Sequence, residues 1–488
     1  MKKIVCLLLV CFTLITCFAG CGKKSGNEKK NNNSKNGVEN SVLPEKDWGG
    51  KELKVFINQN ELVGNIIVNE DTTDLVGYEV FSRNAYIENK YNFDIFCTEM
   101  TNAECPAQKV RNDAAAGEST YDLILDSITD MKGALAEFLF ADLADLDYID
   151  WEAKGWLQEA NDGLDILGYR YICTGDANLY EKSGAVLMYY NSDIMYAITE
   201  EGEDIRQIAL DGNWTMEKMC DLIKRASIID STTNEVSVYG LANPHNEMFY
   251  CYLATGYGMQ IIQKDLDGNL FFSFDDPGVL QQTLISIDEV LKFFCDNSTT
   301  YNQKFKVVPK EKKAETLFLA NRVLFQPDQL CSMKTWKGAN INYGFLPLPK
   351  ANEDIDKYHA AYYGEDTQFF AIPAFAKDLS FSAFALQAMM ENSGGLTHAY
   401  VEEQCKIRGS ADDVDYQLIS LALDNFLYDL GAIFDWGAIK TWIFVDRYDA
   451  NADLQSIPSS GVNNLVTNWE SKKGLAHSEL YAFLNHFQ

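Results

Sequence analysis

Histidine, serine, cysteine and carboxylate side chains carry most enzymatic chemistry, and their spacing in this sequence fits no common catalytic pattern. The five histidines form no HExxH pair and no close cluster, which gives zinc-dependent hydrolysis no support. No GxSxG, P-loop or GxGxxG pattern occurs. With 71 acidic residues, the chain always offers some pair that resembles the two catalytic carboxyl groups of a glycoside hydrolase. Glycoside hydrolysis depends on the distance between those groups, which a sequence does not give. The residues therefore predict no catalytic centre, no cofactor and no metal site.

One cysteine has a predicted chemical role. Lys2 and Lys3 precede an apolar run over residues 4–18, which is too short to span a bilayer and has the build of a secretory signal. Residues 19–21 (AGC) close this run and resemble the bacterial lipobox, although Phe18 replaces the usual leucine. That resemblance implies that Cys21 receives a lipid and becomes the mature N-terminus. An ordinary signal peptide and an uncleaved anchor are the alternatives.

The eight cysteines after Cys21 form no CxxC pair. We therefore expect buried free thiols, not a zinc knuckle or a thioredoxin-like motif. Whether Cys97 and Cys105 form a disulfide stays open, because pairing depends on a geometry that spacing alone does not fix.

The charge balance argues against two classes of partner. The formal net charge is −30, whereas nucleic-acid binding depends on clustered Lys and Arg. The same charge repels the folded body from an anionic membrane surface, so attachment would come from the lipid. Residues 22–41 are rich in Asn, Lys, Ser and Gly and predict a flexible tether, and no later run of 18 apolar residues predicts a membrane span. At 488 residues, the chain is long enough for two or more folded units.

Apolar runs and helical patterns alternate through the first part of the chain. Strands are expected at residues 51–57 (KELKVFI), 93–96 (FDIF) and 121–125 (YDLIL). Helices are expected at 78–91 and at 106–116, where Gly117 offers a left-handed C-cap. This order is typical of a parallel sheet with helices on its faces, which places the chain in the α/β class.

Later segments add strands that end in loops, at residues 185–191, 323–330, 343–350 and 367–373. A hairpin turn is expected at Asp267 and Gly268. Thr215 should cap a helix with Met219, Leu222, Ile223 and Ala226 on one face. Asp276 should cap a helix over 275–294 whose apolar stripe is Leu280, Leu284, Ile287, Leu291 and Phe294. A further amphipathic helix is expected over 378–392.

The order of these pieces resembles the extracellular solute-binding proteins of bacterial ABC importers, in their large carbohydrate-type, family 1-like group. The matching stretches are EVFSRNAYIENKYNFDI (79–95), YDLIL (121–125), ADLADLDYID (141–150), ICTGDANL (172–179), VLMYYNSDIM (186–195), NWTMEKMCDLIKRA (213–226), YGLA (239–242), INYGFLPLPK (341–350) and FFAIP (369–373). Each stretch is short, and their shared order over residues 51–384 carries the resemblance. The C-terminal hundred residues match less clearly, with FDWG (434–437) as the best piece.

The resemblance implies a type II periplasmic-binding-protein fold, in which two α/β lobes joined by hinge strands close over a ligand. The implied division is a signal peptide (1–20), a tether (21–48), lobe 1 (49–174 and 364–400) and lobe 2 (175–363 and 401–488). The implied function is that of a non-enzymatic lipoprotein on the extracytoplasmic face of the cell membrane. It would capture a small solute, expected to be a mono- or oligosaccharide, for ABC transporter permease subunits. A surface-anchored glycoside hydrolase is the alternative.

In that fold, loops at the carboxyl ends of strands from both lobes face the cleft. Transferred onto this sequence, the expected ligand-binding residues are Asn58, Glu61, Asp126, Ser127, Asp176, Asn178, Tyr257, Gln260, Gln326, Gln329, Trp336, Glu365 and Asp366. Carboxylate and amide groups can bond sugar hydroxyls, and Trp336 is the expected aromatic platform for a pyranose ring. The structural alternatives are that Asp126 caps the helix that follows it, that Asp176 braces the hinge and that Trp336 belongs to the core.

Overall fold

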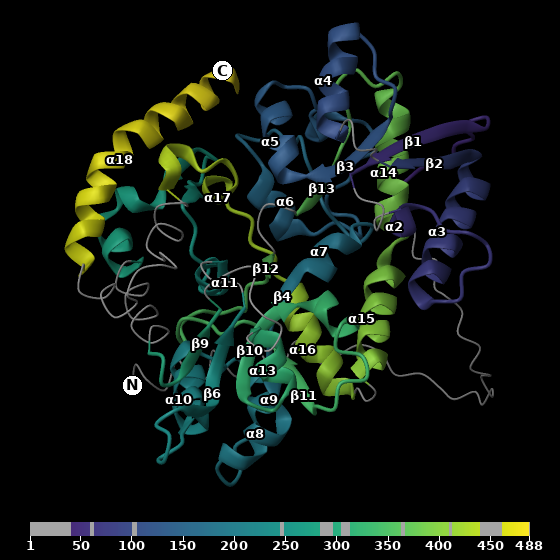
Figure 1. The fold of residues 1–488 in the computed structure, drawn as a ribbon. Coiled ribbons are helices and arrows are strands. Elements are labelled where there is room, and N and C mark those ends of the chain that lie inside the picture. Colours follow the sequence, from purple (N-terminus) through teal and green to yellow (C-terminus); the bar gives the residue numbers. More distant parts are fainter. Residues whose placement is uncertain are drawn as a thin grey trace, which may run out of the picture. The chain divides into compact units, whose positions relative to one another are not determined.

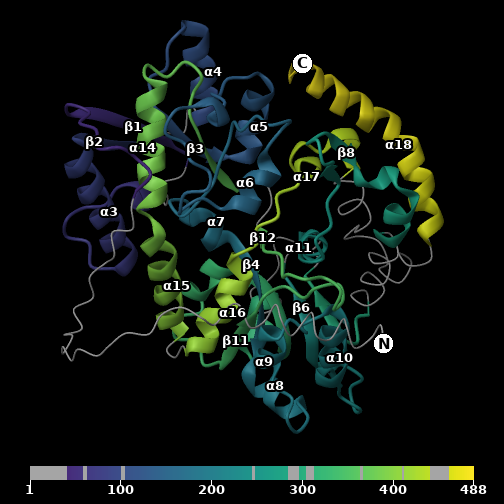
Figure 2. The same ribbon diagram turned by 180° about the vertical axis from the view of Figure 1, so that it is seen from behind.

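The computed structural model describes residues 41–58, 63–99, 105–244, 248–283, 296–303, 313–362, 367–408, 412–439 and 461–487. Residues Val42–Gln488 form one compact unit. Its described part contains a four-stranded sheet, a seven-stranded sheet and a separate hairpin (Figures 1 and 2).

The first sheet has the strand order β13-β3-β1-β2. Strand β1 (Lys51–Ile57) pairs in parallel with β2 (Phe93–Glu99) and with β3 (Leu123–Ser127), whereas β13 (Gln368–Ala371) pairs antiparallel with β3. The parallel arrangement expected for the first three strands is confirmed. The third strand begins two residues later than expected and extends to Ser127.

Helices connect and cover this sheet. They are α2 (Val63–Ile66), α3 (Leu75–Tyr91), α4 (Pro106–Ala116), α5 (Ile128–Ala136), α6 (Gln158–Leu164) and α14 (Leu379–Glu391). As expected, Gly117 ends α4 in the left-handed conformation, with φ +79°. Asp378 caps α14 by accepting from the backbone N–H of Phe381.

Helix α14 is not amphipathic, which corrects the expectation from its sequence. Every residue from Phe381 to Glu391 is buried. The rings of Trp48, Tyr91 and Tyr148 all pack against Phe384 on this helix. Because α14 is covered on all sides, it forms part of the core beside the first sheet, although it also buries the hydrogen-bonded pair Gln387 and Glu391.

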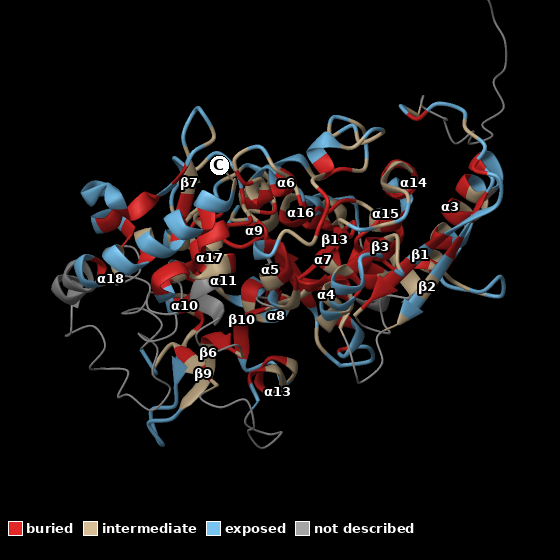
Figure 3. Cartoon of the chain, turned by 90° about the horizontal axis from the view of Figure 1, so that it is seen from above, coloured by how far each residue is buried: buried red, intermediate tan, exposed pale blue. Residues whose placement is uncertain are grey.

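The second sheet has the order β11-β4-β10-β6-β5, with β12 on β4 and β9 on β6. Its strands are β4 (Ala185–Asn191), β5 (Ile228–Ile229), β6 (Val236–Asn243), β9 (Thr300–Asn302), β10 (Val323–Gln329), β11 (Tyr343–Leu346) and β12 (Ala361–Tyr362). Strand β4 is buried along its whole length and runs antiparallel to both β10 and β11, whereas β6 runs parallel to β10 and β9, so this sheet is mixed. In Figure 3, strands β3, β13 and β10 lie among the residues coloured red, which are buried.

Short helices pack around the second sheet: α8 (Ser192–Ile198), α9 (Ile205–Leu210), α10 (Met216–Ala226), α11 (Met248–Gly256), α13 (Ala314–Leu319) and α16 (Asp413–Leu423). Thr215 caps α10, whose buried face is the predicted one. Strands β7 (Ile262–Lys264) and β8 (Leu270–Phe272) form the expected hairpin, with Gly268 at φ +82° in its turn.

The predicted helix over 275–294 is only partly described. Asp276 accepts from the backbone N–H groups of Gly278 and Val279, as a capping residue does, and Leu280 is buried. The remaining stripe residues, Leu284, Ile287, Leu291 and Phe294, lie outside the described residues.

The C-terminal part is helical in its described residues, with α15 (Gly394–Arg408), α17 (Leu430–Phe434) and α18 (Gly461–Leu484). Within the described ranges, no helix combines the length and apolar character that crossing a membrane requires. The six cysteines with described side chains are free thiols, including Cys97 and Cys105, which answers the question of their pairing.

The chain passes between the two sheets at three places. In the first passage, the backbone of Cys173 forms an isolated antiparallel β-bridge with Phe370 of β13 in the first sheet. Helix α7 (Leu179–Gly184) then leads into β4 of the second sheet. In the second passage, the chain returns to the first sheet between β12 and β13. In the third passage, it runs through α14, α15 and α16 to the second sheet again. The predicted lobe boundaries stay predictions.

Candidate ligand-binding cleft

A cavity of about 610 Å³ lies where elements of the two sheets meet. Helices α2 and α3, which follow β1, contribute one part of its wall. A 3₁₀ helix, η5 (Leu330–Lys334), follows β10 and contributes another, and α7 and α15 complete it. The lining residues are Gly64, Asn65, Val68, Asp74, Val76, Gly77, Leu179, Tyr180, Ser183, Gly184, Gln329, Cys331, Lys334, Tyr400 and Glu403. This volume is within the usual range for small-molecule sites.

Two carboxylates in the lining hold the N-terminus of α3. Asp74 Oδ1 accepts from the backbone N of Gly77 at 2.6 Å. Glu403 Oε1, from α15, accepts from the backbone N of Leu75 at 2.5 Å and of Val76 at 3.3 Å. The first N–H groups of a helix have no partner within the helix, and its N-terminus favours negative charge. Asp74 therefore caps α3 from within the same segment, and Glu403 joins α15 to α3.

Other polar groups of the lining are available to a ligand. The Tyr400 hydroxyl is buried and makes no hydrogen bond in the described structure, and burial raises the pKa of this phenol far above its usual value. The Gln329 side-chain oxygen accepts from the Cys331 thiol at 3.6 Å, which leaves the Gln329 amide N–H groups free to donate. Ser183 Oγ donates to the carbonyl of Tyr180 at 2.9 Å and keeps its lone pairs.

Gln329 is the only predicted ligand-binding residue among the described residues that line this cavity. The structure groups the other predicted residues at separate places. Four positions, Cys21, Glu61, Glu365 and Asp366, lie outside the described residues.

Asn58, Asp126 and Ser127 come together at the carboxyl ends of β1 and β3. Asn58 Nδ2 donates to Asp126 Oδ1 at 2.5 Å and to Asp130 Oδ2 at 3.2 Å. Asp126 Oδ2 accepts from the backbone N of Ala107 in the first turn of α4, at 2.8 Å. No part of Asp126 reaches solvent, and this burial raises the pKa of its carboxyl to about 6. Asp126 thus bonds the first turn of the preceding helix α4, and Ser127, not Asp126, caps the following helix α5.

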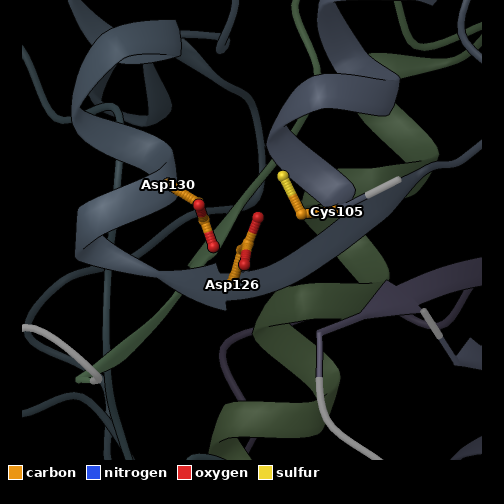
Figure 4. A group of neighbouring side chains, drawn as sticks. All are labelled: Cys105, Asp126 and Asp130. Atoms are coloured by element: carbon orange, nitrogen blue, oxygen red, sulfur yellow. The ribbon is translucent and has the colours of Figure 1, made fainter. Parts of the chain in front are cut away.

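The Cys105 thiol lies beside the same carboxylates, and Figure 4 shows Cys105, Asp126 and Asp130 pointing toward one another. Their potential ligand atoms lie within 4.8 Å of one another. Hydrogen bonds already occupy the carboxylates: Asp126 also accepts from the backbone N of Ser127, and Asp130 from the Ser127 hydroxyl. We therefore assign no metal to this cluster.

Asp176 and Asn178 lie in the first passage between the sheets. Asn178 Nδ2 donates to the carbonyl of Gln368 at 2.8 Å and to Thr174 Oγ1 at 3.0 Å, so it ties this passage to β13. Asp176 is half-buried, and its backbone N donates to the carbonyl of Gly155 at 2.8 Å. Burial raises the pKa of the Asp176 carboxyl.

Trp336 lies in the core around the second sheet and is only 2% exposed. Its ring centroid is 4.7 Å from that of Tyr189 and 5.4 Å from those of Phe318 and Tyr343. Its indole N–H donates to Glu315 Oε1 at 2.9 Å. Both faces of the ring are covered in this conformation, so a sugar could stack on it only after these neighbours moved.

The three remaining predicted residues occupy other surroundings. Gln326 is completely buried on β10 and donates to Asp328 Oδ2 at 3.1 Å. Tyr257, just after α11, is half-buried. Gln260 lines a second cavity of about 330 Å³, together with Asp162 and other residues.

Sequence reasoning missed Tyr400, Glu403, Ser183 and Lys334, all of which line the main cavity. Ser183, Tyr400 and Glu403 lie on helices, and Lys334 ends a 3₁₀ helix, whereas the rule applied to the sequence looked for loops that follow strands. Tyr400 and Glu403 are three residues apart on α15 and so share a face, but this spacing alone does not distinguish a site from a core contact.

No family model matches the sequence, and no curated protein matches it either. Two solved structures share its fold. M. tuberculosis UspC aligns with a TM-score of 0.55 and 14% identity, over 87% of this chain and 100% of that one. A cyclo/maltodextrin-binding protein complexed with maltotetraose aligns with a TM-score of 0.56 and 16% identity, over 87% of this chain and 97% of that one. The chain therefore has the two-lobed α/β fold of periplasmic binding proteins, and the fold prediction is confirmed.

Proposed function

We propose that this protein is the substrate-binding component of an ABC importer and captures a mono- or oligosaccharide in the main cavity. The observation that carries this proposal is the polar cavity of about 610 Å³ built from elements next to both sheets. Its hydroxyl, amide and ammonium groups are the partners that sugar oxygens need. The maltotetraose in the cyclo/maltodextrin-binding protein, which has the same fold, supports a sugar as ligand.

The carboxylates of the cavity favour a receptor over a hydrolase. Glycoside hydrolysis uses two carboxyl groups that flank the scissile bond, one of which must give up a proton. In the described lining, the two carboxylates are Asp74 and Glu403, and both bond backbone amides of α3. Their contacts thus give both carboxylates a structural role at the N-terminus of α3.

Binding to a sugar panel should raise the melting temperature without any turnover. A ligand at a hundred times its Kd stabilises the folded state by about 2.7 kcal/mol through mass action. The measurement is a thermal-shift screen over mono- and oligosaccharides and short peptides, followed by an assay for reducing ends. A shift with peptides alone would overturn the sugar assignment, and released reducing ends would favour the hydrolase.

We also propose that Cys21 carries a lipid that anchors the protein to the extracytoplasmic face of the cell membrane, where permease subunits would receive the solute. The AGC sequence at residues 19–21 supports this. Intact-mass analysis of membrane-extracted protein should show a chain that begins at Cys21 with added lipid. Cys21→Ala should release the protein from membranes, and full retention of this variant would contradict the anchor.

A further inference from the structure

The polar groups of the cavity that are left for a ligand include several hydrogen-bond donors. One oxygen of each carboxylate in the lining, Asp74 Oδ1 and Glu403 Oε1, accepts from backbone amides of α3. The groups left for a ligand include the Tyr400 hydroxyl, which is buried without a hydrogen bond in the described structure, and the amide N–H groups of Gln329. A ligand that supplies acceptors would satisfy them.

Lys334 adds a positively charged donor to the cavity. It is the one cationic side chain in the described lining, and it ends the 3₁₀ helix that follows β10. It forms no ion pair with a described residue, in a chain with 71 acidic and 41 basic residues. Lys109 and Lys218 are paired with Asp113 and Glu203, whereas Lys334 and Lys337 are exposed lysines with no ion pair to a described residue. An ammonium group without an ion pair to the described part of the chain, at a cavity whose two carboxylates each bond backbone amides of α3, can bind an anionic partner.

We infer that the cavity selects acidic sugars, with Lys334 as the counter-ion of a carboxylate or sulfate group on the ligand. This rests on the proposed function and narrows its ligand class. The Tyr400 hydroxyl and the Gln329 amide donate to further oxygens of the same ligand. The attraction acts at contact distance, because at physiological ionic strength charges more than about 8 Å apart are largely screened, and the net negative charge of the body therefore opposes it only weakly.

The test compares three trisaccharides by isothermal titration calorimetry: a galacturonate trimer, a sulfated hexose trimer and maltotriose. The wild type should bind at least one acidic trimer about tenfold more tightly than maltotriose, and which trimer binds separates carboxylate from sulfate. Lys334→Gln should weaken binding of that trimer about tenfold, as expected for loss of a charged hydrogen bond, and change maltotriose binding less than about twofold. Raising salt from 0.05 to 0.5 M should weaken the acidic trimer alone.

Two further variants serve as controls. Lys337→Gln removes an exposed lysine three residues later that does not line the cavity, and it should leave all affinities unchanged. Tyr400→Phe deletes a hydroxyl without a hydrogen bond in the described structure, so it should keep the melting temperature and weaken the acidic trimer about fivefold. Equal binding of neutral and acidic trimers, with no effect of Lys334→Gln, overturns this inference and leaves the proposed function intact. Failure of every sugar to bind overturns both.

Discussion

Lys182→Met is expected to lower the free energy of unfolding by about 3–5 kcal/mol, because it breaks a buried ion pair. The side chains of Lys182 and Glu181 are 2% and 0% exposed. Lys182 Nζ donates to Glu181 Oε2 at 3.2 Å and to the carbonyl of Gly175 at 3.0 Å. Glu181 also accepts from Thr174 Oγ1 at 2.9 Å and from the Tyr428 hydroxyl at 2.6 Å. Without the ammonium group, a carboxylate stays buried with no cation.

Chemical denaturation followed by tryptophan fluorescence measures this effect, and a double-mutant cycle isolates the pair. The matched variants are Glu181→Gln alone and Glu181→Gln combined with Lys182→Met. The double variant should recover much of the loss, because no unpaired charge remains buried. If the two single losses simply add, the ion pair does not couple these residues and the prediction is wrong.

Trp336→Ala is expected to lower the free energy of unfolding by about 3–5 kcal/mol, the usual result of removing a large aromatic side chain from a core. The ring fills the space between Tyr189, Phe318 and Tyr343. Trp336→Phe is the matched control: it keeps an aromatic ring and loses the indole bond to Glu315, so it should cost about 1 kcal/mol from the hydrogen bond plus a smaller packing loss.

Thermal and urea unfolding of both variants, together with sugar titrations, decide between the two roles considered for Trp336. An Ala variant that melts like the wild type but no longer binds sugar would contradict the core role. It would support the platform predicted from the sequence.

The sequence predicts correctly the elements that depend mainly on their own residues. The bounds of β1 and β4 agree with the apolar runs at 51–57 and 185–191, and Thr215 and Gly117 act as caps where expected. Helix α14 was predicted with nearly correct ends but the wrong character, because whether a helix is covered on one side or on all sides depends on its neighbours and not on its own residues.

The site was harder to predict, because distant segments build it. Glu403 bonds to Leu75 across 328 positions of sequence, and only the third passage between the sheets brings α15 to α3. The rule that ligands meet loops after strands selected Gln329, which ends β10 and lines the main cavity. The same rule selected Trp336, which follows that strand by a few residues but turns into the core. Position along the chain does not reveal which way a side chain points.

Strand β13 pairs with β3 but lies more than 200 residues later in the sequence, which has a consequence for biosynthesis. Strands β1, β2 and β3 are all translated by residue 127, yet β3 keeps an open edge until residues 368–371 add the antiparallel neighbour. An unpaired strand edge is a template for wrong partners, and pairing across so long a stretch of chain is slow. The nascent protein therefore passes through a long interval with an incomplete first sheet. Such an interval keeps a chain accessible to chaperones.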